Sequence, residues 1–492
     1  MTLVALLSAC SGATGPTTGV VGTVPTTTTT DTLPPALMRE MRGLWVATVA
    51  NIDWPSRTTL TADQQKAELT SILDRAQAGG LNAVLLQVRP AADALYQSSI
   101  EPWASMLTGT QGQSPGYDPL AFAVTEAHAR GLELHAWINP FRAGTARDTA
   151  KLAPTHLFTS RRDLLRVYGA QLWLDPGEPA VHDHVIRVVQ DILARYDVDA
   201  IHADDYFYPY VEIDAAGKAI DFPDSASYAR SGSTLSRADW RRANVDRFVQ
   251  RLYTETHAAR PRVKVGISPF GIWRSGTPPG IVGLDAFSSI YADSRKWLQQ
   301  GWVDYFAPQL YWAIAPPQQS FPVLLDWWVS QNTMGRHVWP GLASYRVADG
   351  TASAFSGTEI PDQVKLARAR TTGHLLYNTN TTLTKNSGAV IGSLASLYTD
   401  RALPPAFAWL DATAPGMPSI RVASRIATLT PAAGQSAPRW WAIRSRSSSG
   451  WSTRVIFGDK FTYSIDAGAE VVTVNAVSQT GIVSPTATWR GP

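Results

Sequence analysis

A short stretch in the middle of the chain, residues 199–209, joins an apolar strand to carboxylates and aromatic rings. The strand ends in two adjacent carboxylates, Asp204 and Asp205, and Tyr206 and Tyr208 follow directly. Glycoside hydrolysis needs one carboxyl group that is protonated to assist the leaving oxygen, and a second, ionised one that acts as nucleophile or activates water. Because rings beside the carboxylates can stack on a sugar, this stretch predicts a site that cleaves glycosidic bonds.

Alternation along the strand decides where its side chains point. Ala200, His202 and Asp204 fall on one face, which we take as the interior of the fold, and Asp205 starts the loop. Two adjacent carboxylates suppress each other's ionisation, so one of them can stay protonated near neutral pH. In chitinase-type enzymes the corresponding frame is Asp-Gly-x-Asp-x-Asp-x-Glu, and here Tyr206 occupies the position of the catalytic Glu. A standard chitinase is therefore excluded: Asp204 could orient a substrate N-acetyl group, and the proton donor would be Asp205 or a residue from another strand.

Glu101 is the candidate donor from another strand. It lies beside a tryptophan in the loop after the second predicted strand, where a carboxyl group in a partly dry aromatic site has a raised pKa. A structural role stays open for Asp205, which could cap the following turn or bind Arg89 or Arg142. The catalytic candidates are thus Asp204, Asp205 and Glu101.

Short apolar strands alternate with amphipathic helices over most of the chain. Strands are predicted at residues 43–49, 83–88, 132–138, 200–204, 263–268, 303–309, 338–343 and 375–379, and helices between them at 62–78, 119–130, 180–196, 237–259 and 362–370. Eight such units predict an α/β fold of the (β/α)8 TIM barrel type. A doubly wound open sheet is the alternative, but no Gly-rich phosphate loop follows the first strand.

Polar and aromatic residues recur just after the predicted strand ends. In a barrel all eight ends open on one rim, so these residues would converge on one cleft, although each alone could be a capping or loop residue. His135, inside the third strand, is a further candidate, with a buried core histidine as its alternative. The predicted substrate-binding residues are Asp53, Trp54, Arg89, Asp93, His135, Asn139, Arg142, Tyr206, Tyr208, Trp273, Gln309, Tyr311, Trp312, Tyr345 and Asn378. No metal-ligand spacing such as His-Glu-x-x-His occurs, so we expect no metal and no cofactor.

Composition excludes some classes of function. The chain has 492 residues, 45% of them hydrophobic and 17% charged, with a net charge of +3, which fits a globular protein of two or three domains. No run of five or six basic residues exists, so we expect no nucleic-acid partner. The 18 Trp and 16 Tyr are numerous for this length, which a carbohydrate cleft or simply the core would explain.

The single cysteine, Cys10, follows an apolar run that ends Leu-Ser-Ala. This pattern resembles the lipobox of a bacterial lipoprotein, in which Cys10 would carry the lipid, with a chance Ala-Cys pair as the alternative. The run is too short to span a membrane. No Lys or Arg precedes it, so we expect the natural signal peptide to begin upstream of Met1. Residues 11–38, rich in Thr, Pro and Gly, would form a flexible tether. We therefore expect a lipid-anchored protein on the periplasmic side of the bacterial envelope, at the outer membrane.

The pattern changes again beyond residue 411. A breaker cluster at 414–418 precedes short alternating segments at 420–422, 440–444, 454–457, 461–465 and 471–476, which predict a fibronectin type III-like β-sandwich over residues 415–492. Such modules space or dock domains, and this one could contact cell-division or other envelope proteins. Trp440, Trp441 and Trp451 could instead bind glycan. The predicted organisation is a signal segment at 1–10, a linker at 11–38, a barrel at 39–411 and this sandwich.

Several ordered motifs resemble glycosyl-hydrolase-like family ten, also described as the DUF187 family. They are MRGLWVATVANIDWPS at 41–56, LLQVRP at 85–90, EPW at 101–103, PGYD at 115–118, HAWINPFR at 135–142, DDYFYP at 204–209 and APQLYW at 307–312, within a match from about 40 to 400. The resemblance implies a (β/α)8 glycosidase of the bacterial envelope that acts on peptidoglycan glycan strands without stem peptides. The alternative is a non-catalytic glycan-binding protein with a degenerate glycosidase barrel.

Overall fold

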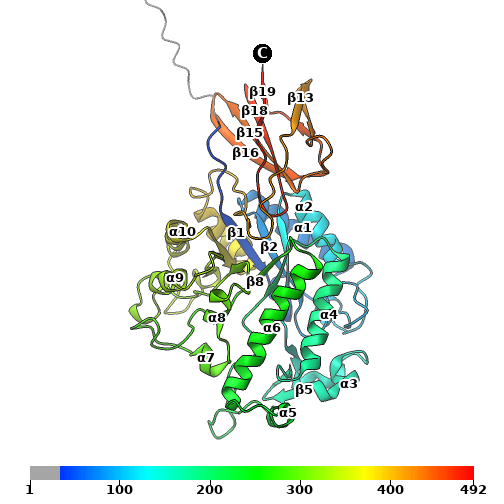
Figure 1. Cartoon of the computed structure of the whole chain (residues 1–492), viewed down its shortest axis with the longest axis vertical. Helices are drawn as coiled ribbons and strands as arrows, with labels where there is room; N and C mark the ends of the chain where they lie inside the picture. The colour runs from blue at the N-terminus through cyan, green and yellow to red at the C-terminus, as the bar shows by residue number, and fades with distance from the viewer. Residues whose placement is uncertain (1–33, 492) are drawn as a thin grey trace, which may run out of the picture. The chain divides into compact units, whose positions relative to one another are not determined.

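The computed structural model describes residues 34–491, except for the side chains of residues 147 and 148. Cys10 and the greater part of the predicted tether lie outside this range. Within the described residues, nine parallel strand segments form one sheet in the order β10-β9-β8-β7-β3-β2-β1-β12-β11 (Figure 1). The segments are β1 Met41–Val46, β2 Ala83–Arg89, β3 Glu133–Ile138, β7 Ala200–Ala203, β8 Lys264–Ile267, β9 Tyr305–Phe306, β10 His337–Val338, β11 Gly341–Ala343 and β12 Gly373–Tyr377.

The sheet closes on itself through one interrupted strand. β10 pairs with β9, whereas β11 pairs with β12, and only Trp339 and Pro340 separate the two segments. The two ends of the strand order therefore belong to one stretch of chain, and the fold is a (β/α)8 barrel, as the sequence predicts. The prediction of a single strand at 338–343 is wrong, because Pro340 has no N–H group to continue the ladder.

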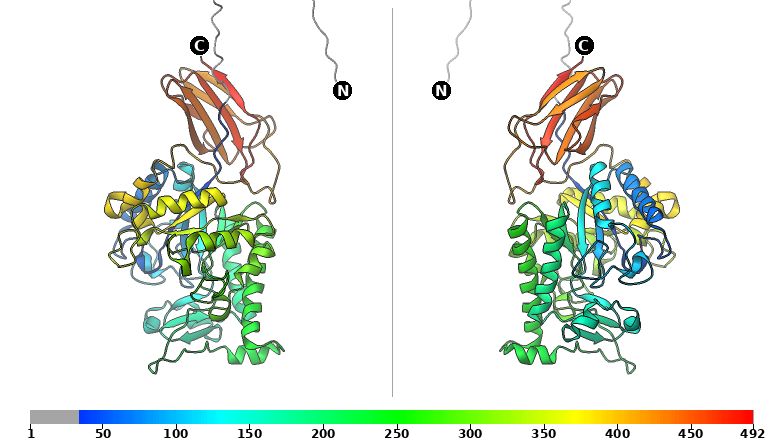
Figure 2. Two further views of the ribbon diagram at one scale, coloured as in Figure 1. Left: turned by 90° about the vertical axis from the view of Figure 1, so that its left-hand side faces the viewer. Right: turned by 90° about the vertical axis from the view of Figure 1, so that its right-hand side faces the viewer.

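Helices cover the outside of the barrel. Each strand position is followed by a helix: α1 Ala62–Ala78, α2 Pro119–Ala129, α4 Pro179–Arg195, α6 Arg237–Ala259, α8 Ser294–Gln299, α9 Phe321–Ser330, α10 Glu359–Arg370 and α11 Ala389–Ser393 (Figures 1 and 2). α1 begins with a capping box, in which Thr61 and Gln64 satisfy each other's backbone N–H groups, and it buries Leu69, Leu73 and Ala76 against the strands. The five predicted helices are all present, with ends within three residues of those predicted.

The barrel has two separate apolar layers. Strand residues that point outward, such as Ile201 and Ala203, join the large core between strands and helices. Residues that point inward form a second cluster, which includes Trp45, Trp137 and Tyr305. Ala200 belongs to this inner cluster, so the inward face of β7 is the one that alternation predicts.

Insertions enlarge the barrel at the end remote from the C-terminal domain (Figures 1 and 2). A small antiparallel sheet, in the order β4-β6-β5, follows β3, and the sequence analysis did not predict it. The inserted elements are β4 Arg142–Thr145, α3 Leu157–Ser160, β5 Leu165–Tyr168, β6 Gln171–Leu174, α5 Ser225–Ser231 and α7 Ala286–Ser289. Glu212 ties the long loop after β7 to this sheet, because its carboxylate accepts hydrogen bonds from the Ala170 N–H and the Gln171 side chain.

The C-terminal domain is a β-sandwich of two antiparallel sheets. One sheet has the order β13-β14-β17 and the other β16-β15-β18-β19. Their bounds are β13 Ser419–Ala423, β14 Ile426–Thr430, β15 Trp440–Ser447, β16 Gly450–Phe457, β17 Thr462–Ser464, β18 Val471–Val477 and β19 Ala487–Arg490; β14 and β19 were not predicted. Trp441, Ile443, Val472 and Val474 form its core.

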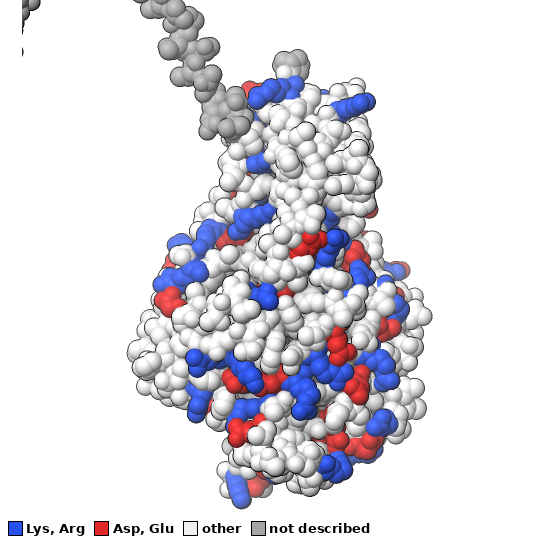
Figure 3. All heavy atoms as spheres, viewed as in Figure 1, with Lys and Arg blue, Asp and Glu red and all other residues white. Residues whose placement is uncertain are grey.

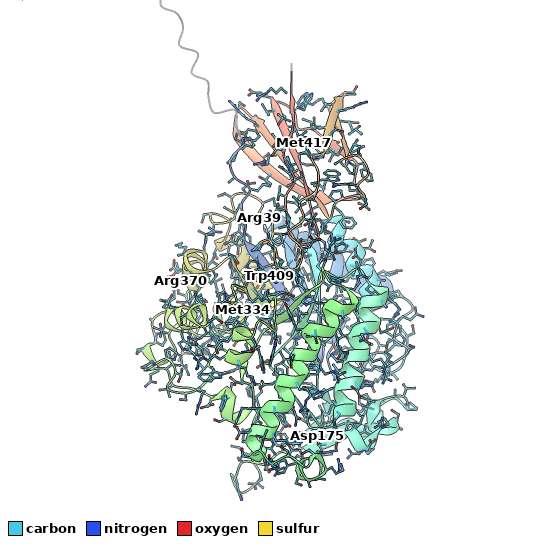
Figure 4. The ribbon with its side chains drawn as sticks, viewed as in Figure 1. Arg39, Asp175, Met334, Arg370, Trp409 and Met417 are labelled. Carbon is cyan, nitrogen blue, oxygen red and sulfur yellow. The ribbon has the colours of Figure 1, made fainter. Side chains whose placement is uncertain are left out.

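The sandwich lies at the end of the barrel where the strands begin. Trp409 donates from Nε1 to Asp304 Oδ1 at 2.8 Å, just before β9, and Arg39 donates to the carbonyl oxygens of Pro404 and Gly481. Figure 4 shows Arg39 near the base of the sandwich and Trp409 farther into the barrel, with Asp175 at the opposite end. The carboxyl ends of the strands therefore open away from the sandwich.

Charges of both signs are interspersed over the face of the barrel seen in Figure 3. No helix among residues 34–491 is long and apolar enough to cross a membrane.

Candidate active site

A cavity of about 230 Å³ opens at the carboxyl ends of the barrel strands. It contains both carboxylates of the pair that the sequence singled out, Asp204 and Asp205. Five of its lining residues were predicted: Asp204, Asp205, Tyr206, Gln309 and Tyr311. Six were not: Trp45, Trp137, Tyr210, Ser268, Phe270 and Tyr377. We call this cavity the cleft.

Asp204 is almost fully buried at the base of the cleft. Its Oδ2 accepts hydrogen bonds from Trp137 Nε1 at 3.0 Å and Asn139 Nδ2 at 3.3 Å, and the Tyr206 N–H approaches Oδ1 at 3.4 Å. Burial, followed by the neighbouring charge of Asp205, raises the pKa of Asp204 to about 7, although the Arg142 charge and the Trp137 hydrogen bond oppose this. A substantial fraction of Asp204 is therefore protonated at neutral pH.

Asp205 has a different set of partners. Tyr210 Oη donates to its Oδ2, and Gln309 Nε2 donates to its Oδ1 at 2.9 Å. Burial raises the pKa of Asp205, but both hydrogen bonds act against this because they stabilise the ionised form. Asp204 accepts hydrogen bonds as well, so both carboxylates combine burial, which raises the pKa, with donors that favour the ionised form, and the two groups titrate as a pair.

The floor of the cleft rests on a hydrogen-bonded chain through the barrel interior. Trp45 Nε1 donates to His202 Nε2 at 3.1 Å, and Ser268 Oγ lies 3.1 Å from the same nitrogen. Tyr305 Oη lies 3.0 Å from His202 Nδ1 and 2.9 Å from His135 Nδ1. Burial holds the pKa of His202 well below its ordinary value, so this ring is neutral.

One fixed donor sets the tautomer of His202. The indole N–H of Trp45 can only donate, so His202 Nε2 accepts, and His202 Nδ1–H donates to Tyr305. The Tyr305 hydroxyl then donates to His135, whose Nε2–H donates to Glu133 Oε2 at 3.0 Å. Since His202 Nε2 carries no hydrogen, Ser268 can only donate to it, and this hydrogen bond shares the single lone pair of the nitrogen with the Trp45 indole.

An aromatic wall borders the cleft on one side. Tyr311 and Tyr377 stack with centroids 5.7 Å apart, and Trp45 meets Tyr377 edge-on at 6.1 Å. Tyr345, which was predicted, lies 5.9 Å from both tyrosine rings and is 37% exposed. The wall offers ring faces and edges that suit the apolar faces of sugar rings.

Glu101 is not in the cleft, and its predicted raised pKa is wrong. Its carboxylate receives two hydrogen bonds from Arg89, at 2.6 and 2.8 Å, and His184 Nε2 lies 2.8 Å from Oε1. Burial alone would raise the pKa, but the Arg89 charge and the His184 hydrogen bond outweigh it and bring the pKa of Glu101 to about 2. A carboxylate that is ionised at all working pH values cannot donate the proton.

Several predicted substrate contacts are buried away from the cleft. Each is engaged within the protein: Trp54 donates to Gln65 O, Asp93 accepts from Gln111, and His135 belongs to the interior chain. None of these side chains lines the cleft, and their direct contact with a substrate stays a prediction. The residues concerned are Trp54, Arg89, Asp93, His135 and Tyr208, each no more than 1% exposed.

Three more of the predicted residues lie around the cleft. Asn139 contacts Asp204, and the Arg142 guanidinium lies 4.0 Å from the Tyr206 ring centroid. Trp312 packs edge-on against Phe270 with centroids 5.6 Å apart.

Three others support loops. Asp53 accepts from the N–H groups of Ala47 and Asn380, Asn378 accepts from the Thr381 N–H, and Trp273 stacks on Trp327.

Two of the unpredicted lining residues carried a signal in the sequence. Trp45 and Trp137 lie inside β1 and β3, one or more residues before the strand ends. They were not predicted because they do not follow the strand ends, where the other rim residues lie. The alternation used for Asp204 would have placed both on the inward face. No group of three or more His, Cys, Asp or Glu residues within the described range is arranged to hold a metal ion.

The fold is a closed (β/α)8 barrel, and its carboxyl rim holds a carboxylate pair with raised pKa values beside an aromatic wall. This is the architecture of a glycoside hydrolase. The chain belongs to the glycosyl hydrolase-like 10 family, whose model matches residues 40–355. The resemblance of its motifs to this family is thereby confirmed.

Known proteins similar to this chain carry the same description. It is 41% identical over 400 residues to the glycosyl hydrolase YngK of Bacillus subtilis, covering 78% of this chain and 76% of that one. It is 37% identical over 343 residues to the glycosyl hydrolase DigH of Escherichia coli K12, covering 64% and 76%. The PgaB (BpsB) glycoside hydrolase domain of Bordetella bronchiseptica superposes with a TM-score of 0.48 at 13% identity, covering 75% and 100%.

Proposed function

We propose that the protein hydrolyses glycosidic bonds in bacterial cell-wall glycan, with peptidoglycan strands that have lost their stem peptides as the substrate. The main support for hydrolysis is the buried Asp204–Asp205 pair, because the two carboxylates have different hydrogen-bond partners. Family membership supports the reaction class, and the resemblance of the ordered motifs supports the choice of polymer.

In this mechanism Asp204 is the general acid. Its raised pKa leaves a proton available at neutral pH for the leaving glycosidic oxygen. Asp205, ionised and held by Tyr210 and Gln309, stabilises the positive charge that develops on the sugar at the transition state. A water molecule then forms the new bond to the anomeric carbon and gives its proton to the Asp204 carboxylate, which restores the acid. The aromatic wall positions the sugar ring above the pair.

The test is to incubate the purified protein with peptide-free peptidoglycan strands and to measure new reducing ends. Release of reducing ends supports the proposal. If none appear, hydrolysis of this substrate is rejected; if the strands still bind, the non-catalytic glycan-binding alternative takes its place. Anhydro-sugar products would instead identify a lytic transglycosylase.

The pKa of the acid predicts the pH dependence. We expect kcat/KM to fall as the pH rises through about 7, because deprotonation of Asp204 removes the general acid. Activity also falls at low pH, where Asp205 becomes protonated, so the profile is bell-shaped. Initial rates measured across the neutral range check this. A rate that stays constant through neutral pH would contradict the role of Asp204.

We also propose that Cys10 carries a lipid that holds the protein in the bacterial envelope, on the periplasmic side of the outer membrane. The lipobox-like residues before Cys10 and the Thr- and Pro-rich tether support this anchor. Envelope proteins, including those of cell division, are the partners proposed for the sandwich. Replacing Cys10 with Ser should move the protein from the membrane fraction to the soluble fraction; an unchanged distribution would reject the anchor.

A further inference from the structure

The Arg89 side chain lies in a buried cluster behind the cleft and is completely inaccessible to solvent. Its Nε and Nη2 donate to the two carboxylate oxygens of Glu101. Its Nη1 donates to the main-chain oxygens of Asn139, at 2.5 Å, and of Pro140, at 3.1 Å. The guanidinium therefore joins the loop after β2 to the backbone at the end of β3, and His184 from α4 supports Glu101 from behind.

Asn139 connects this cluster to the carboxylate pair. Its Oδ1 accepts from the backbone N–H groups of Arg142, at 2.9 Å, and of Phe141, at 3.3 Å. With that oxygen engaged, the orientation of the amide is fixed, and Nδ2 must point to Asp204 Oδ2. A shift of the Asn139 backbone would move this donor away from Asp204.

We infer that Arg89, held in place by Glu101, is a positioning residue that fixes Asn139 and, through it, the orientation of Asp204. Glu101, which was predicted as the acid, thus acts only indirectly. It holds Arg89, Arg89 holds Asn139, and Asn139 contacts Asp204. Neither Arg89 nor Glu101 lines the cleft, so neither touches the substrate. The inference rests on the proposed function only in that it takes Asp204 to be the acid.

The test uses a signal that does not depend on activity. Trp137 Nε1–H donates to the same Oδ2 of Asp204, so its indole NMR resonance in the 15N-tryptophan-labelled full chain reports protonation of the pair. The Trp137→Phe variant assigns the resonance, because the Trp137 signal is the one that it lacks. In the wild type the chemical shift of this resonance should titrate with a midpoint near pH 7. Loss of a hydrogen bond to the ionised carboxylate raises that midpoint, so Asn139→Ala is expected to raise it by roughly 0.5–1 pH unit.

Arg89→Lys keeps the positive charge but cannot hold Glu101 and two carbonyl oxygens in the same fork. It is expected to raise the midpoint by at least half as much as Asn139→Ala does. The double variant Arg89→Lys/Asn139→Ala should show the same midpoint as Asn139→Ala alone. Arg42→Lys is the matched control: Arg42 is also fully buried and donates to Glu40, but it lies in β1 at the opposite end of the barrel. This variant should leave the midpoint unchanged.

Should Arg89→Lys fail to fold, the double variant Arg89→Met/Glu101→Leu removes the ion pair without changing the net charge and is expected to give the same rise. A midpoint that stays at its wild-type value in both, or a shift that adds fully to that of Asn139→Ala, would overturn the inference. If the midpoint moves as expected while no reducing ends appear, the positioning role stands and the proposed hydrolysis does not.

Discussion

Replacement of Asp204 with Asn is expected to lower kcat on glycan strands by about 10³-fold, within the 10²- to 10⁴-fold range that general acid catalysis contributes. Asparagine has the size of aspartate and can still accept the hydrogen bond from Trp137, but it has no proton to give to the leaving oxygen. The aromatic wall is unchanged, so KM should stay within about threefold of the wild-type value. Steady-state release of reducing ends measures both quantities.

The control is Asp63→Asn, which removes an exposed carboxylate from the first turn of α1 and should leave both parameters unchanged. Asp205→Asn belongs in the same series, because it removes the negative charge that stabilises the developing cation. If Asp204→Asn keeps more than about a tenth of the activity and Asp205→Asn loses it, the two carboxylates have the opposite roles.

The fold was accessible to sequence reasoning because each barrel unit repeats a local signal. An apolar run is followed by a predicted amphipathic helix in five of the eight units, and the outer core and inner cluster are both consequences of period-two patterning in the strands. The break in the strand at Trp339 and Pro340 was not predicted, because the chain on both sides of it is apolar. The small sheet β4-β6-β5 was not predicted, because each of its strands has four residues and such short strands show little periodicity in the sequence.

The carboxylate pair was also accessible, since Asp204 and Asp205 stand at the end of a well-defined strand. What the sequence did not show is which partner each polar residue takes. Glu101 was expected beside rings, where burial would raise its pKa. Arg89 Nε lies 2.8 Å from Glu101 Oε2, however, and the arginine charge lowers the pKa of Glu101 instead. Residues 89 and 101 are 12 positions apart, and only the path of the loop between them brings their side chains together.

Arg439, just before β15, is one of the residues that attach the sandwich to the barrel, and its side chain is largely buried. Its Nη2 donates to Asp199 Oδ1 at 2.6 Å and approaches His128 Nε2 at 2.8 Å, and its Nη1 bonds to Asp197. Asp199 precedes β7, and its other oxygen accepts from the Leu134 N–H. Burial alone would raise the pKa of Asp199, but the charges of Arg439 and His128 more than offset it and hold this pKa far below its ordinary value.

Replacement of Arg439 with Met is therefore expected to lower the free energy of unfolding by about 3 kcal/mol at neutral pH, because it leaves a carboxylate buried without its main partner. Asp199 has a depressed pKa in the folded state, so its contribution is fully present above the unfolded value of roughly 3.9 and is lost as the pH falls below it. The difference between wild type and variant should consequently shrink in acid. Urea unfolding at neutral and acid pH measures it.

Arg421→Met, on the exposed side of β13 in the same domain, is the control and should change the free energy of unfolding by less than about 0.5 kcal/mol. The cleft lies at the far end of the barrel, so the kcat of folded Arg439→Met should equal that of the wild type. If the variant instead loses less than about 1 kcal/mol at neutral pH, the apolar contacts of Trp440, Ala442 and Val477 with Leu403 hold the sandwich without the ion pair. If the loss does not diminish in acid, it arises from the packing of the arginine stem and not from its charge.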